Sequence, residues 1–254
     1  MRKNLQIINI QQCRGQAMVE FIIIFMVMIM LVFGIFQFTL IYKAKITLNY
    51  ATFEAVRAGA VNNARLAAVQ QAFARGMSPL YTHRDNVEAV HAARKQVIDE
   101  INAGDQVCIE RINPITQDFT DHQIANTYFP DPNLTESTAI PVDNLYYRSD
   151  KSTSGPGGGS GRVSIQDATL LKIKVTYCYP LYVPFLNRVI PEWFTGTANV
   201  TRFTGDTTLA SHDAGFGAFK QACINNRQLP ITASAVMRMQ TPVVNDPGYA
   251  LSCD

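Results

Sequence analysis

RGQAMVEFIIIFMVMIMLVFGIFQFTLIY, residues Arg14 to Tyr42, is the stretch that decides the fold. From Phe21 to Tyr42 it holds about 22 residues without a charge, which as a helix at about 1.5 Å per residue span roughly 33 Å. That length crosses the hydrocarbon core of a bilayer. A cleaved secretory signal has a shorter apolar core and ends in small residues, and residues 38–45 offer no such site. The sequence therefore predicts one membrane-spanning helix.

The charges on either side of the apolar run predict its orientation. Arg2, Lys3 and Arg14 precede the run with no acidic residue among them, whereas only Lys43 and Lys45 follow it closely. Basic residues concentrate on the cytoplasmic side of a membrane helix. The slight excess before the run predicts a cytoplasmic N-terminus, with the rest of the chain on the other side.

Glu20 is the carboxylate at the junction between the polar leader and the apolar run. An ionised carboxylate drawn into lipid costs on the order of a few kcal/mol, so it needs either water at headgroup level or a charged partner. Both alternatives stay open on this residue alone. Its neighbours form a pattern: Gly15, then four residues, then Glu20 and Phe21 opening directly into the helix.

This pattern of Gly15, four residues, Glu20 and an aromatic resembles the processing site of type IV prepilins. The resemblance implies that a membrane prepilin peptidase cuts after Gly15 on the cytoplasmic side. Residues 1–15 are then a leader, and Gln16 is the new N-terminus and a candidate for methylation. The resemblance also implies that Glu20 pairs with the free N-terminal amine of a neighbouring subunit during assembly.

The resemblance narrows over roughly Arg14 to Ala60, where GQAMVEF, FGIFQF and YATFEAVRAGA are similar to the TadE-like pseudopilins of tight-adherence (Flp) pilus systems. It implies a minor pilin of the inner membrane that takes part in surface adhesion and is not an enzyme. Its implied partners are the prepilin peptidase, other pilin and pseudopilin subunits, and the pilus assembly platform. The predicted span, residues 16–42, contains one glycine, Gly34, and no proline. Glycine weakens a helix, so whether the span unwinds at Gly34 during assembly stays open.

Residues 43–254 are predicted to form one periplasmic domain of the α+β class. The helix is expected to continue past the membrane as a long amphipathic helix, which ends at Ser78-Pro79 at the latest. A second helix is predicted from Arg84 to Ala103, with Gly104 as its stop signal. The apolar residues that recur at three and four positions along the first helix are Ile46, Tyr50, Phe53, Ala60, Ala64 and Ala67.

Alternating apolar and polar residues predict the strands. Residues 107–112 are rich in β-formers, residues 171–179 and 231–240 alternate with the period of a sheet that has one buried face, and residues 197–204 are a weaker candidate. Helices first and strands later, without a βαβ rhythm, predict an antiparallel sheet on which the long helix packs, as in pilins. The apolar face of the second helix consists of Val87, Val90, Val97 and Ile101. We predict that this face packs on the sheet, and the alternative is that it binds a partner.

The segment around residues 113–162 is rich in Pro, Asp, Asn, Ser and Gly, and culminates in SDKSTSGPGGGSGR from Ser149. Such a composition predicts a long flexible loop. Residues 179–193 are apolar but irregular because prolines interrupt them. This second segment is either domain core or a surface bound by another subunit.

The sequence contains five cysteines, and their positions predict which of them form disulfides. Cys13 leaves with the leader, and an even count in an exported domain predicts two disulfides among the four others. We expect Cys108 to pair with Cys178, because both lie in predicted strands. Cys223 is then expected to pair with Cys253. Separations of tens of residues argue against a zinc site.

Neither charge nor motifs predict a second chemistry. The chain of 254 residues has a formal charge of +2, and removing the three basic residues of the leader leaves 19 basic against 20 acidic residues, so there is no basic field for nucleic acid. Residues 150–154 spell D-x-S-x-S, a signature of von Willebrand A metal sites, but a glycine run follows instead of a helix. The adjacent residues 211–213, Ser-His-Asp, cannot converge as a catalytic triad. We predict no catalytic residue, metal or cofactor.

Two classes of function are compatible with these features. The first is a minor pilin or pseudopilin in the biogenesis or assembly of a Tad/Flp-type pilus, or a permanent membrane component of that system. The alternative is a membrane-tethered periplasmic binding module or enzyme, for which the sequence presents no convergent site residues. Gly15 discriminates between them, because a tether has no use for a processing site.

Overall fold

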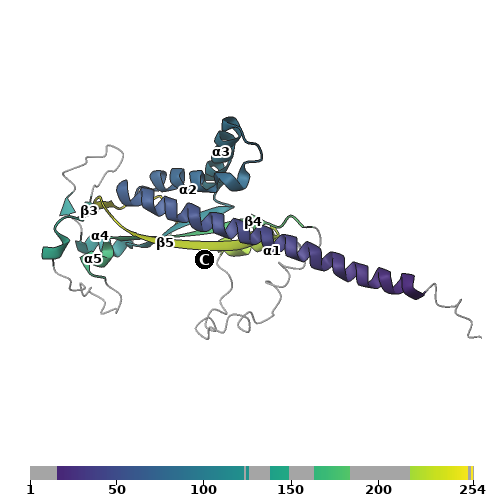
Figure 1. Ribbon diagram of the computed structural model, residues 1–254. Helices are drawn as coiled ribbons and strands as arrows, with labels where there is room; N and C mark the ends of the chain where they lie inside the picture. Colours follow the sequence, from purple (N-terminus) through teal and green to yellow (C-terminus); the bar gives the residue numbers. More distant parts are fainter. Residues whose placement is uncertain are drawn as a thin grey trace, which may run out of the picture.

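One helix, α1, runs along most of the molecule and projects beyond the rest of it at its N-terminal end (Figure 1). The computed structural model describes residues 16–122, 124–125, 138–148, 163–183, 218–250 and 253. The described elements are α1 (Gln16–Val61), α2 (Leu66–Tyr81), α3 (Val87–Ala103), β1 (Val107–Asn113), α4 (Thr116–His122), β2 (Ile124–Ala125), β3 (Thr138–Ile140), η2 (Leu145–Tyr147), α5 (Ile165–Ala168), β4 (Leu170–Pro180), α8 (Ala218–Asn225), β5 (Gln228–Arg238) and β6 (Val243–Val244).

The main sheet confirms the predicted α+β class. It is antiparallel in the order β1-β4-β5, with Ile173 of β4 opposite Arg111 of β1 and Ala235 of β5. Leu171, Ile173 and Val175 are fully buried and face the helices, so the predicted alternation holds over the first half of β4. It fails beyond Val175, because Thr176 and Cys178 are buried as well. Three short strands form a second antiparallel sheet in the order β2-β3-β6. The predicted strand at residues 197–204 lies outside the described residues.

The long helix ends well before its predicted limit. It stops at Val61, the chain reverses through Asn63 and Ala64, which both have positive φ, and α2 returns alongside α1 to Tyr81 with Pro79 inside its last turn. Helix-terminating residues with positive φ are commonly glycine or asparagine, so the Asn-Asn pair at 62–63 was the sequence signal for this break. The end at Val61 lies within the predicted limit, but the break there was not predicted, and the expectation that Ser78-Pro79 stops a helix was wrong because α2 continues through Pro79 to Tyr81.

The two helices of this hairpin approach very closely. A side chain at Gly76 of α2 would place its Cβ 2.5 Å from the Cα of Ala51 in α1. At the other end, a Cβ at Gly59 would lie 2.8 Å from a methyl group of Leu171 in β4 and 3.0 Å from one of Val69 in α2. These glycines allow α1 to pack against both α2 and the sheet.

We call the described residues from 37 to 253 the head. Within the head, alanine and leucine, rather than aromatic residues, form the buried face of α1. Ala44, Leu48, Ala51 and Ala55 are all fully buried. Of the residues predicted to share one apolar face, Ile46, Tyr50 and Phe53 lie on the opposite side of the helix and are exposed, whereas Ala60 and Ala64 are fully buried. The periodicity predicted the helix, but between residues 44 and 55 the other face packs on the head.

The second helix also packs differently from its prediction. α3 begins after Asn86, whose side chain accepts a hydrogen bond from the Ala89 amide (2.9 Å), and it ends at Gly104 in the left-handed conformation as predicted. Val97 and Ile101 are buried, but α3 packs mainly on α2, which Figure 1 places between α3 and α1. Val87 is left 74% exposed. The prediction that this face packs on the sheet was wrong.

The predicted flexible segment contains regular structure. α4, β3 and η2 all lie within residues 113–162, and Phe119 and Ile140 of that region are buried. Figure 1 places α4, α5 and β3 at the end of the molecule opposite the projecting end of α1. The glycine-rich run and residues 150–154 lie outside the described residues, as do residues 211–213 and most of 179–193.

The head cysteines form two disulfides, Cys108–Cys253 and Cys178–Cys223, so the predicted pairing was wrong. Cys108 lies opposite Thr176 in the sheet, which makes Cys178 its diagonal neighbour. Diagonal neighbours in a sheet have Cα atoms about 7–8 Å apart, beyond the roughly 4.4–6.8 Å that a disulfide spans.

Cys108 and Cys178 instead each bond to a segment that lies next to their strand. The Ala250 amide donates to the Ile109 carbonyl (3.1 Å), so the C-terminal segment runs beside β1 and brings Cys253 to Cys108. α8 leads directly into β5, the neighbour of β4, and so places Cys223 over β4.

Candidate functional site: the outer face of the amino-terminal helix

The projecting part of α1 is apolar on all sides. Nearly all side chains from Met18 to Phe36 are exposed, with only Ile29 and Gly34 half-buried. α1 is the one described helix that is long and apolar enough to cross a membrane, with a mean hydropathy of 2.9 in its most apolar window. Residues 16–36 number about 21, or roughly 32 Å of helix, which matches a bilayer core.

The head first covers α1 at Gln37. This side chain is 1% exposed, and its Oε1 accepts a hydrogen bond from the Val183 amide (3.0 Å) just after β4. Its Nε2 is buried without a partner among the described residues. Gln37 lies before the end of the predicted span at Tyr42, so part of that span carries protein contacts. A polar residue inside an apolar run was the available signal for this contact.

The sequence-predicted processing and assembly residues lie at the free end of α1. Gly15 precedes the described residues, and Gln16 opens the helix. Glu20 is exposed and lies about one turn further along. The Phe21 ring stacks on the Phe25 ring, with centroids 5.6 Å apart. The helix therefore presents Glu20 and Phe21 on a surface that no described part of the head covers.

Beyond Gln37 the apolar surface of α1 continues along one side, which we call the outer stripe. Its members follow one another at three or four residues from Tyr42 to Phe53, with Val61 two turns further on, and all are about half exposed or more. The outer stripe consists of Tyr42 (68% exposed), Ile46 (49%), Tyr50 (56%), Phe53 (46%) and Val61 (47%). Such spacings place all of them on one face of a helix. The stripe joins the projecting part of α1 without interruption by buried positions.

Charges do not interrupt this stripe near the membrane-length segment. Lys45 turns toward the sheet, where its Nζ donates to the Thr232 carbonyl, and burial lowers the pKa of this amine. Tyr50 Oη and Glu54 Oε1 lie 3.4 Å apart along the helix edge. Lys43 is exposed, on the flank of the stripe. Arg57 lies four residues from both Phe53 and Val61 and is exposed. The outer stripe is therefore an apolar and aromatic surface from Tyr42 to Phe53, with polar margins, and Arg57 separates this part from Val61.

The described residues contain neither a metal site nor a catalytic pocket that could serve as an alternative functional site. They contain no cluster of three metal-ligating side chains. A shallow apolar groove between α2 and α3 is bordered by Arg75 and Arg94, and Arg94 donates to Gln71 Oε1 (2.6 Å). A second shallow depression lies along α3 near Glu100. Neither brings together the groups that a catalytic site needs.

Comparison with known families supports the sequence resemblance. Residues 15–57 match the TadE-like protein family. The matched segment begins at Gly15, includes Glu20, and ends within the outer stripe. Comparisons with curated proteins and with solved structures found no match.

Proposed function

We propose, from the TadE-like segment at residues 15–57, that this protein is a minor pilin or pseudopilin in the assembly of a Tad/Flp-type pilus. A prepilin peptidase removes residues 1–15, and the mature chain begins at Gln16. The protein spans the inner membrane once, with its head in the periplasm. Its role is structural rather than enzymatic.

The outer stripe is the observation that carries this proposal. A tether needs apolar surface only along the membrane-length segment, and its helix would be polar where it leaves the membrane. Here Ile46, Tyr50 and Phe53 stay exposed on the part of α1 that packs on the head. Contiguous exposed apolar surface marks an interaction site. A helix that leaves the bilayer to join a bundle of neighbouring helices has a use for such a surface along its whole length.

Glu20 completes the assembly surface. When α1 packs beside the helix of another subunit, this carboxylate leaves water, and its charge needs a partner. The free amine that cleavage creates at Gln16 of the neighbouring subunit supplies the opposite charge. Cleavage after Gly15 and assembly through Glu20 are therefore linked steps.

The N-terminal mass of the protein from its native membrane, with and without the peptidase of its pilus system, tests processing. We expect a chain that begins at Gln16 only when the peptidase is present, and an uncleaved chain for Gly15→Leu. Cleaved Glu20→Ala should insert normally but fail to enter pili, whereas Glu54→Ala, a carboxylate further along α1, should enter them. A chain that starts at Met1 under both conditions would instead favour the membrane-tethered module.

A further inference from the structure

Two adjacent tyrosines stand almost fully exposed on η2. Tyr146 is 91% and Tyr147 is 86% exposed, and their rings meet edge to face, with centroids 5.3 Å apart and planes at 89°. η2 bonds to α5, which Figure 1 places at the end of the molecule opposite the projecting part of α1. The pair is therefore remote from the membrane segment.

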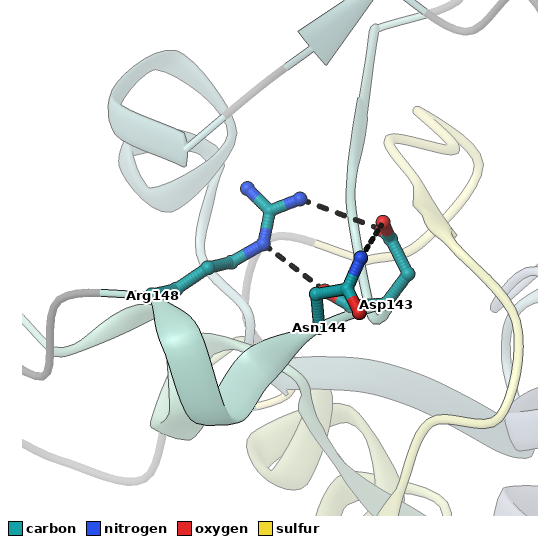
Figure 2. Close-up of polar contacts among 3 residues, drawn as sticks. All are labelled: Asp143, Asn144 and Arg148. Atoms are coloured by element: carbon teal, nitrogen blue, oxygen red, sulfur yellow. Dashed lines mark hydrogen bonds and ion pairs between the residues drawn. The ribbon is translucent and has the colours of Figure 1, made fainter.

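The backbone beneath the two rings is fastened at both ends. Figure 2 shows the Arg148 guanidinium bridging back to Asp143, with Nε donating to the main-chain carbonyl (3.1 Å) and Nη2 to the carboxylate (3.4 Å). Asn144 starts the turn in the left-handed conformation. From α5, Gln166 Nε2 donates to the carbonyls of both Leu145 and Arg148 (3.1 Å each).

This fastening matters because a rigid surface loses little conformational entropy on binding. Tyrosine adds a large amphipathic contact area with few rotatable bonds. Exposed aromatic rings on a loop that contacts nothing else would be free to move. Here the loop that carries Tyr146 and Tyr147 is held in one shape by the head itself, which is the arrangement of a preorganised binding surface.

Charge and area restrict the ligand. Within residues 143–148 the charged side chains are Asp143 and Arg148, and they pair with each other, so this turn carries no net charge. Two tyrosine rings can bury roughly 300–500 Å², less than the roughly 800 Å² per partner of a stable protein interface. A small neutral ligand that has both an apolar face and hydroxyl groups satisfies both limits.

We propose that Tyr146 and Tyr147 form a binding site for neutral glycans at the end of the head farthest from the membrane segment. The C–H face of a pyranose ring carries partial positive charge and stacks on the electron-rich face of a tyrosine ring. In this edge-to-face pair an open ring face remains for a sugar to stack on, and the phenol groups and Asn144 offer hydrogen bonds to the hydroxyls. This site is independent of the proposed role of α1.

The test uses the full chain in lipid nanodiscs with cellohexaose, chitohexaose and maltohexaose as probes. Saturation-transfer NMR should detect contact with at least one of them, and titration should give its affinity. The double variant Tyr146→Ala/Tyr147→Ala should weaken that affinity at least about tenfold. The double phenylalanine variant keeps the rings and should retain most of it. Tyr182→Ala removes a ring that is 69% exposed elsewhere and should change nothing.

Three results would overturn the proposal. One is the absence of binding to all three hexasaccharides up to about 10 mM. Another is binding that survives in the double alanine variant, which would place the glycan elsewhere. The third is a self-association of the full chain, measured by sedimentation, that the double alanine variant abolishes, because the pair would then be a contact between copies of this chain.

Discussion

Replacing Ile46, Tyr50 and Phe53 by glutamine should block entry into pili without unfolding the head. These side chains are 49%, 56% and 46% exposed. Fully burying such a side chain contributes about 1.5–3 kcal/mol, so burying the exposed half of each against neighbouring subunits contributes about 1 kcal/mol. The three together account for about 3 kcal/mol, or roughly a 150-fold change in the assembly equilibrium.

Glutamine limits the damage to the head itself. It is a good helix former, and its methylene groups still cover the neighbours that the native side chains touch. The matched control is Val87→Gln with Val90→Gln, because these residues are 74% and 45% exposed on α3, away from the outer stripe.

The assay is the fraction of the protein in sheared pili relative to the membrane, measured by quantitative immunoblot in the native cell. We expect a large loss for the triple variant, none for the control pair, and similar melting temperatures for both. Wild-type levels of the triple variant in sheared pili would refute the assignment of the outer stripe as an assembly surface.

Three further predictions concern the head. Removing the Cys108–Cys253 disulfide by serine substitution should lower stability by about 2–5 kcal/mol and make the C-terminal segment sensitive to protease, and an unchanged melting temperature would contradict this. Gly76→Leu should lower the melting temperature because its Cβ meets the α1 backbone at 2.5 Å, whereas Gly34→Leu, which meets nothing within 4 Å, should not. Burial raises the pKa of the Tyr81 phenol, so the folded state holds this proton more tightly than the unfolded state does, and stability should fall as pH rises above about 10. Tyr81→Phe should flatten that decline in thermal unfolding between about pH 9 and 11.5.

The fold class and the strands could be predicted because they depend on local periodicity. The alternation around Ile173 and the stop at Gly104 are properties of adjacent residues, and both were confirmed. The break after Val61 has one local signal, the Asn-Asn pair at 62–63, but tertiary contacts hold it in place: the Asn63 amide donates to Thr241 Oγ1 (3.0 Å). A local pattern does not predict a partner 178 residues away in the chain.

The candidate site was predicted where its chemistry is local and missed where it depends on packing. Gly15 and Glu20 follow from spacing within the leader and the start of α1, and their roles stay predictions. Which face of α1 stays exposed could not be derived, because Ile46 and Leu48 are equally apolar and only the approach of α2 and the sheet decides between them. The disulfide pairing likewise depends on strand register and on the path of the C-terminal segment.

The turn between α1 and α2 is closed by residues that lie about 180 positions further along the chain. Asp246 Oδ2 accepts from the Leu66 amide (2.8 Å), and Tyr249 Oη donates to the Ala64 carbonyl (2.8 Å). During translation the apolar part of α1 enters the membrane long before these contacts exist. Contacts so distant in sequence form late. A nascent chain that stops before Asp246 therefore leaves this turn open, so the helical hairpin lacks its closing contacts until 180 further residues have been added after Leu66.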